Sequence, residues 1–173
     1  MRFLLIDRIL EYQKGKYAIG SKDVTMSEDF LADHFPKFPL MPGALQLESI
    51  SQLASWLIFV SKDFKVKGTL SELGNIKFKD LVKPGDQLII EVTFESMDSE
   101  GVTFKAHAKV KDKVKTTLNS GRMKYSDVEK LEDPEEAKEY FHYLTDLILE
   151  LFSCDSILLI KSSISSRGKL VLV

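Results

Sequence analysis

The stretch from Gly43 to Val60 constrains the fold more than any other part of the chain. Apolar side chains recur there at helical spacing and cover most of a helix circumference; they are Ala44, Leu47, Ile50, Leu53, Ala54, Leu57, Ile58 and Val60. A helix that is apolar nearly all round is a buried one, because only the interior offers it partners on every side. At a rise of 1.5 Å per residue its length would be about 25 Å. We therefore expect a long central helix with the rest of the chain folded around it.

Strand-like sequence flanks this helix on both sides. Before it, residues 3–13 and 17–25 form two such runs joined by "KGK", which predicts a hairpin. After it come "NIKFKDLV", "DQLIIEVTFESM", "GVTFKAHAKVK" and "KVKTTLNSGRMKY", with turn sequences "KPGD" and "DSEG" between them. One buried helix among about six strands predicts an α+β fold in which an antiparallel sheet wraps around the helix.

Length and composition exclude several classes of protein. A chain of 173 residues is long enough for one domain with a real core. The N-terminal "FLLI" is interrupted at once by Asp7 and Arg8, so we expect neither a signal peptide nor a membrane span. The single Cys154 excludes an internal disulfide and a cysteine-based metal site, which favours a cytoplasmic protein. A net charge of -2 does not indicate nucleic-acid binding.

The segment "HFPKFPLMPGALQLE", residues 34–48, carries the candidate chemistry. Its three prolines restrict the backbone, which suits a loop that must hold the imidazole of His34 in one place. Pro42 and Gly43 directly precede the helix, so free N–H groups are expected at its positive end. Such groups can hold a developing oxyanion.

Glu48 is expected in the first two turns of the helix, with Gln52 one turn further on the same face. Partial desolvation would favour the protonated carboxyl and suit Glu48 as a proton donor, with His34 as a matching base. The two residues are too far apart in sequence to share a helix face, so the loop or a second copy of the chain must bring them together. The plainer alternative is a loop histidine with satisfied hydrogen bonds and a glutamate that serves the helix dipole.

The same segment resembles the active-site signature of the beta-hydroxyacyl-acyl-carrier-protein dehydratases of type II fatty acid synthesis, which have the hot-dog fold. That signature is His-Phe-Pro-Gly-x-Pro-x-Met-Pro-Gly-x-Leu, then an acid, then a Gln. The matching positions are His34, Phe35, Pro36, Pro39, Met41, Pro42, Gly43, Leu45, Glu48 and Gln52. The flanks are similar too, so the resemblance covers about residues 3–125. A Glu rather than an Asp at position 48 favours the general dehydratase over the branch that also isomerises the double bond.

The resemblance implies a hot-dog fold and the dehydration of beta-hydroxyacyl thioesters to trans-2-enoyl thioesters. His34 would remove the alpha proton, Gly43 N–H would hold the thioester oxygen, and Glu48 would protonate the departing hydroxyl. Gln52 would orient Glu48, which family members supply from the neighbouring subunit. It further implies an acyl carrier protein as partner, a homodimer or higher homo-oligomer, and neither a metal nor another cofactor.

Two residues of the loop are candidates for substrate contact. Lys37 stands where the family usually has Gly, and it would cost on the order of 1 kcal/mol or more in strain if that position needs a positive φ. It could instead sit at a tunnel mouth and meet the acidic carrier or the phosphate of its pantetheine arm. Phe38 could line an acyl tunnel with Trp56 and Phe59, although Trp56 is most simply a core residue.

Residues 127–173 extend beyond the expected hot-dog domain of residues 1–126. A helix is predicted over about 134–152, capped by Asp133. Its apolar stripe comprises Tyr140, Leu144, Leu147 and Leu151, with Phe141 and Ile148 beside them. We expect the stripe to dock on the outer face of the sheet or on another subunit; a lid or carrier-binding element is the alternative.

The remaining titratable residues predict no second site. His107 and the lysines at 105, 109, 111, 113 and 115 lie in strand-like alternation, which is typical of a solvated face, with a carrier dock as the alternative for the lysines. His142 is expected on the surface of the appended helix. The competing functions are a hot-dog thioesterase, a dehydratase of a pigment or polyketide-like pathway, and a non-catalytic subunit that binds acyl chains or a carrier.

Overall fold

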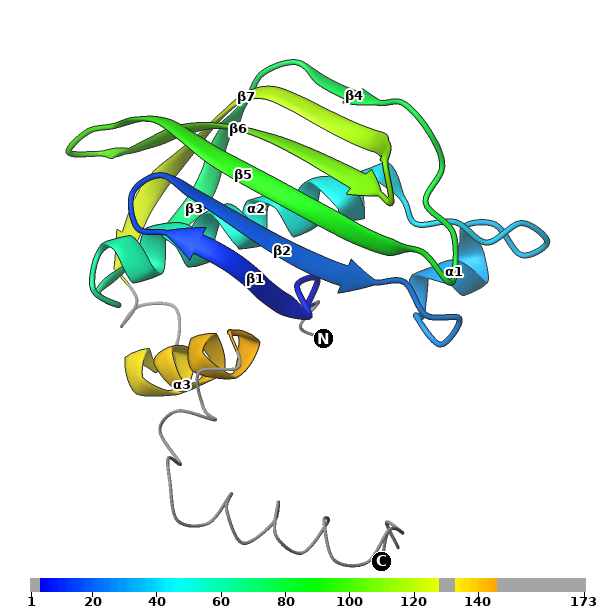
Figure 1. Ribbon diagram of the computed structural model, residues 1–173, viewed down its shortest axis with the longest axis horizontal. Coiled ribbons are helices and arrows are strands. Elements are labelled where there is room, and N and C mark those ends of the chain that lie inside the picture. The colour runs from blue at the N-terminus through cyan, green and yellow to red at the C-terminus, as the bar shows by residue number, and fades with distance from the viewer. Residues whose placement is uncertain (1–3, 128–132, 146–173) are drawn as a thin grey trace, which may run out of the picture.

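The computed structural model of the protein describes residues 4–127 and 133–145. Figure 1 shows strands curved around one long helix, with a short helix beneath them. The elements in chain order are β1 (Arg8–Gln13), β2 (Tyr17–Asp23), α1 (Phe30–Asp33), α2 (Gly43–Ser61), β3 (Val66–Leu73), β4 (Ile76–Phe78), β5 (Gln87–Met97), β6 (Gly101–Val110), β7 (Lys113–Asp127) and α3 (Pro134–Leu144).

The strands form a single antiparallel sheet in the order β1-β2-β5-β6-β7-β3, and β4 pairs with the other part of β7. The expected antiparallel sheet around a helix is therefore confirmed. Strand β3 was not predicted from the sequence; it pairs only with β7 and exposes its last three residues. An edge strand with one neighbouring strand and mostly solvent-exposed side chains lacks the apolar alternation by which strands are predicted.

Helix α2 is held by the concave face of the sheet. Every second residue of β6 and of the first half of β5 points inward and is buried, as Ile90, Val92 and Phe104 illustrate, and the last turns of α2 are buried as well. Each large apolar side chain buried in this way contributes about 1.5 to 3 kcal/mol. The first turns differ, because Ala44 and Glu48 are exposed. The sheet thus encloses one side of α2 and leaves another open. Within residues 4–127 and 133–145 no helix is long and apolar enough to cross a membrane.

Helix α3 begins where the sequence predicts. Asp133 caps it through its side chain, which accepts hydrogen bonds from the N–H groups of Glu135 (2.8 Å) and Glu136 (3.3 Å), and Pro134 is the first helical residue. The described helix ends at Leu144. The expected stripe residues Leu147, Ile148 and Leu151 lie outside the described residues, and the division at residues 126 and 127 stays a prediction.

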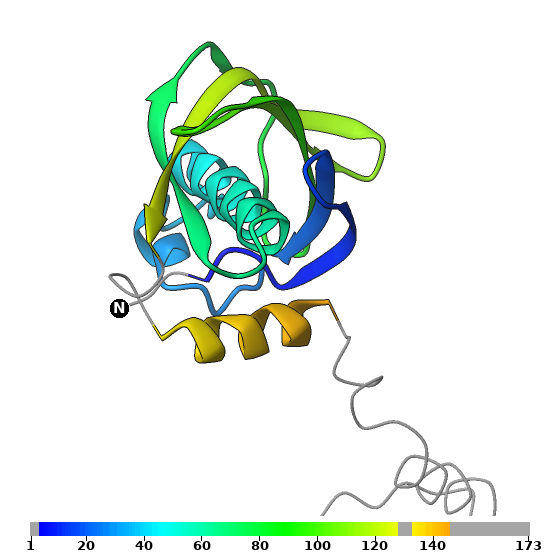
Figure 2. The same ribbon diagram turned by 90° about the vertical axis from the view of Figure 1, so that its left-hand side faces the viewer.

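The docking place of α3 differs from the expectation. Figure 2 shows α3 lying across the side of α2 that the sheet leaves open, not on the outer face of the sheet. The ring of Phe141 packs against the rings of Tyr12, Trp56 and Phe64 at centroid distances of 5.5, 6.0 and 5.6 Å. The reason is that the open side of α2 carries apolar and aromatic groups at its C-terminal end, whereas the outer sheet face is polar.

A pair of substitutions on α3 tests this docking. Phe141→Ala should lower the free energy of unfolding by about 3 to 5 kcal/mol, because the ring is fully buried among three others. Tyr143→Ala, on the exposed side of the same helix, should change it by less than about 0.5 kcal/mol. Denaturant unfolding of both variants measures the difference. Equal stability of the two variants would contradict the packing described here.

Candidate active site

The loop that carries His34 closes on itself through backbone hydrogen bonds. The carbonyl of His34 accepts from Leu40 N–H (2.9 Å), and Phe35 and Phe38 bond each other in both directions at 3.2 and 2.9 Å. His34 directly follows α1, and its half-buried ring stacks on Phe35 with the centroids 4.4 Å apart. The imidazole is therefore held by a compact turn rather than by a free loop.

The hydrogen bond of His34 determines which ring nitrogen can act as a base. Nδ1 lies 3.1 Å from the carbonyl oxygen of Leu40, and a carbonyl oxygen can only accept a hydrogen bond. Nδ1 must carry the proton for this bond to form. In the neutral imidazole the free lone pair is then on Nε2, which is the atom able to take up a proton.

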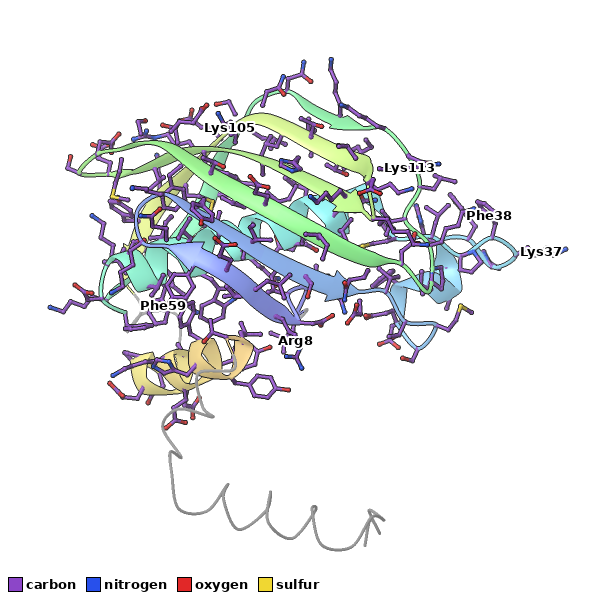
Figure 3. All side chains as sticks on the ribbon, in the orientation of Figure 1. Arg8, Lys37, Phe38, Phe59, Lys105 and Lys113 are labelled. Atoms are coloured by element: carbon purple, nitrogen blue, oxygen red, sulfur yellow. The ribbon has the colours of Figure 1, made fainter. Side chains whose placement is uncertain are left out.

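The loop is also fastened to the segment between β4 and β5. Met41 N–H donates to Val82 O at 2.8 Å, and the ammonium of Lys83 lies 5.0 Å from the centroid of the Phe38 ring. Lys37 is exposed at the loop tip, and Figure 3 shows it pointing away from the molecule. Its φ is not positive, so the strain considered for a lysine in place of glycine does not arise.

The first turn of α2 presents backbone donors and is anchored from within. Pro42, the N-cap, accepts from the N–H groups of Leu45 (3.0 Å) and Gln46 (3.1 Å). In the described part of the chain no group accepts from Gly43 N–H, which lies at the positive end of the helix dipole. This end of α2 therefore keeps a donor available for an oxyanion.

A buried pair of polar side chains anchors this turn to the sheet. This pair was not predicted from the sequence. The side-chain amide of Gln46 donates to Met41 O (3.2 Å) and its oxygen accepts from the hydroxyl of Thr116 on β7. Both side chains are buried, so the bond forms in a low-dielectric interior where loss of either partner is costly. Only the apolar surroundings of Gln46 in the helical stretch could have indicated it, because its partner is distant in sequence.

Glu48 and Gln52 lie together on the open side of α2. The amide nitrogen of Gln52 donates to Glu48 Oε1 at 2.9 Å, and the amide oxygen accepts from Leu5 N–H at 2.9 Å. The N-terminal segment thus fixes which end of the amide faces Glu48, and Glu48 Oε2 has no hydrogen-bond partner in the described chain. The expected partial desolvation of Glu48 is wrong for the single chain, because this carboxyl is exposed. The sheet covers the opposite side of the helix.

The structure brings only some of the predicted site residues together. Within the described chain no hydrogen bond or ion pair joins His34 to Glu48, whose partners are Leu40 and Gln52 respectively. Phe38 does not lie beside Phe59, since the two side chains occupy opposite ends of the molecule (Figure 3). Trp56 is a buried core residue, as the simpler interpretation predicts.

Lysines gather at the sheet end that adjoins the start of α2. Figure 3 shows Lys113 at the same end of the molecule as Lys37. Lys115 departs from the expected solvated lysine face, because its side chain is only 10% exposed and bonds Asp80 at 2.6 Å. This hydrogen bond, the N–H of Leu81 and the positive charges of Lys115 and Lys113 hold the pKa of Asp80 below its ordinary value.

His107 lies outside this region, on the outer face of the sheet. Its Nε2 is 3.4 Å from Glu91 Oε2, and both side chains border a shallow hollow of about 320 Å³. This placement agrees with the predicted strand-face role. Among residues 4–127 and 133–145 no cluster of three or more His, Cys, Asp or Glu side chains could hold a metal ion.

Solved structures with the same arrangement define the class of fold. The Streptococcus mutans protein smu.793, solved bound to acetyl CoA, superposes with a TM-score of 0.57 at 14% identity and covers 73% of this chain and 94% of its own. The PaaI protein of the E. coli phenylacetic acid degradation operon gives 0.55 at 14% identity, with 68% and 81% covered. At such identities the likeness shows the fold alone, and that fold is the hot-dog fold.

Sequence comparison then identifies the family. The FabA-like domain matches residues 1–118. The 3-hydroxyacyl-acyl-carrier-protein dehydratase FabZ of Thermoanaerobacter sp. strain X514 is 43% identical over 116 residues, which are 66% of this chain and 82% of that protein. The chain therefore belongs to the FabA-like family, and the resemblance predicted from residues 34–52 is confirmed.

Removal of one hydroxyl tests the anchor of α2. Thr116→Val keeps the side-chain shape but leaves the oxygen of Gln46 buried without a donor, which should lower the free energy of unfolding by about 1 to 3 kcal/mol. Thr117→Val is the matched control, because its side chain is half-buried on the other face of the same strand. Denaturant titration compares the two variants. A loss no larger at position 116 than at position 117 would show that the bond contributes little.

Proposed function

We propose that the protein dehydrates beta-hydroxyacyl chains carried by an acyl carrier protein, giving trans-2-enoyl thioesters in fatty acid biosynthesis. Its family membership makes the chain a hydro-lyase. The observation that carries the proposal is that His34, Gly43, Glu48 and Gln52 stand at the matching positions of a chain 43% identical to 3-hydroxyacyl-acyl-carrier-protein dehydratases.

The reaction can be written with these groups alone. Nε2 of His34 removes the proton alpha to the thioester carbonyl, and the electron pair moves onto the carbonyl oxygen. Gly43 N–H, at the positive end of α2, stabilises the negative charge on that oxygen. The enolate then collapses to the alpha-beta double bond and expels the beta hydroxyl. Oε2 of Glu48 supplies the proton that makes the leaving group water.

A second copy of the chain would complete the site. In one chain Glu48 is exposed beside Ala44 and half-buried Leu47, and no hydrogen bond or ion pair joins it to His34 in the described residues. A copy laid over this open side would desolvate the carboxyl, which favours the protonated form needed in a proton donor. It would also bring a second His34 loop to the surface that carries Glu48. We propose that the working form is at least a dimer with shared sites.

The lysines near the start of α2 support a carrier protein as partner. Carrier-bound substrates arrive on an acidic protein through a pantetheine phosphate, and a positive surface attracts both. Lys37 is free to meet the phosphate, Lys83 is held against Phe38, and Lys113 is exposed at the same end. Phe38 would then contact the arm or the acyl chain as it enters. We propose a cytoplasmic site of action on the grounds of the single cysteine.

The assay must separate dehydration from the competing functions. Beta-hydroxybutyryl and longer beta-hydroxyacyl carrier thioesters should yield enoyl thioesters, detected by mass. Release of free acid would instead indicate a thioesterase, and binding without turnover a non-catalytic subunit. His34→Ala and Glu48→Gln should each lower kcat by a factor of about a hundred or more, the usual scale for a general base or acid, while both proteins stay folded. Near wild-type turnover in either variant refutes the assigned roles.

Mixing the two inactive variants tests the shared site. If the base of one chain works with the acid of its partner, a mixed dimer contains one intact His34–Glu48 pair and one pair that lacks both groups. We expect activity to return on mixing, up to about a quarter of the wild-type level if half of the dimers are mixed and each has one working site of two. Subunit exchange is verified by native mass spectrometry with one variant isotope-labelled. Complete exchange without recovery would place each site within a single chain.

A further inference from the structure

The ring of Phe78 presses on the first residue of α2. A Cβ added to Gly43 would lie 3.0 Å from both Cε1 and Cζ of Phe78 and 3.1 Å from Cε2. Carbon atoms in ordinary contact are about 3.5 to 4.0 Å apart, so no side chain fits here unless the ring moves. A Cβ at position 43 would therefore require the far edge of the Phe78 ring, or the start of α2, to shift by a few tenths of an ångström.

The backbone holds Phe78 firmly in this place. Phe78 ends β4 and pairs with Thr116 of β7, the same residue whose hydroxyl bonds Gln46 in the first turn of α2. Immediately after it, Lys79 N–H donates to Lys115 O at 2.7 Å. The backbone of Phe78 therefore pairs with the same residue, Thr116, to which the first turn of α2 is bonded.

Phe78 is nevertheless 49% exposed, which is unusual for a ring so closely held. Its far edge covers Gly43 while the remaining ring surface stays open to solvent. Gly43 N–H has no acceptor in the described chain, so the residue that the ring contacts also carries an unoccupied donor. An apolar surface next to such a donor limits the approach of water, and a hydrogen bond to a charged oxygen is stronger where water is excluded.

We infer that Phe78 is a positioning residue of the dehydration reaction, which acts through Gly43. Its ring fixes the start of α2 and shields Gly43 N–H, so that this donor meets the thioester oxygen rather than water. The inference rests on the proposed function. It assigns to Phe78 an effect on the transition state, in which the oxygen becomes negative, and little effect on substrate binding.

Kinetics of Phe78 variants give the first test. Phe78→Ala should lower kcat on a beta-hydroxyacyl carrier thioester about tenfold, with KM changed much less, because the lost shielding matters once charge develops. Phe78→Leu, which keeps an apolar group over the donor, should retain most of the wild-type kcat. Met97→Ala is the control for truncation of an exposed apolar residue at the far end of β5, and its kcat should equal the wild-type value.

A double substitution gives the sharper test. Gly43→Ala retains the N–H but brings a Cβ to 3.0 Å from the ring, so the ring or the start of α2 must shift by a few tenths of an ångström and kcat should fall. A misplacement of about 1 Å costs about a hundredfold, so the loss should be smaller than that. Adding Phe78→Ala removes the obstacle, and kcat should rise above that of Gly43→Ala alone, a non-additivity expected only of residues in contact. Thermal unfolding of all variants confirms that they are folded.

Each outcome is decisive. An unchanged kcat in Phe78→Ala, or losses that simply add in the double variant, overturns the inference while the proposed function stands. If Gly43→Ala does not fold, the comparison of Phe78→Ala with Phe78→Leu decides, and equal losses in these two variants reject the role of the apolar cover. A wild-type protein without dehydratase activity rejects the proposed function, and the inference falls with it.

Discussion

The packing of α2 into the concave sheet is the interaction on which the rest of the structure depends. It sets the direction of the helix, and the helix in turn carries two of the proposed reactive groups as one rigid body. Gly43 and Glu48 are five residues apart, so helix geometry alone separates them by about 7.5 Å along the axis. The sheet therefore positions the oxyanion donor and the acid together, while the His34 loop has to be positioned separately.

The His34 loop is positioned by local hydrogen bonds and by a partly buried ion-pair network upstream of it. Lys22 of β2 bonds Asp7 at 3.2 Å and Glu28 at 2.7 Å, which ties the segment before α1 to the sheet. Burial by itself would lower the pKa of this lysine, but the bond to Glu28 and the charges of Asp7 and Glu28 outweigh it and raise the pKa. The ammonium thus stays charged and holds the segment that leads into α1 and His34 against the sheet. The His34 loop and the start of α2 are therefore positioned by the same sheet.

How much could be predicted from the sequence follows from the range of each interaction. The buried helix, the first hairpin and the cap at Asp133 are signalled by neighbouring residues, and the structure has all three. The bond between Gln46 and Thr116 joins residues 70 positions apart, and no local pattern indicates it. The exposure of Glu48 was missed for a related reason: a helix can be apolar nearly all round and still be covered on one side only. The combination of His34, Gly43 and Glu48 entered through family resemblance, since spacing alone left the plainer alternative open.

The aromatic cluster at the far end of α2 bears on how a second copy could bind. Trp56, Phe64, Tyr140 and Phe141 pack on one another, so the C-terminal half of the open side is already covered within the chain by α3. Ala44 and Glu48 remain exposed on the N-terminal half. Burial of apolar surface drives association, and the surface still available for it here lies beside the proposed acid. Helix α3 therefore does not block a shared site, because it leaves uncovered the half of α2 on which such a site would form.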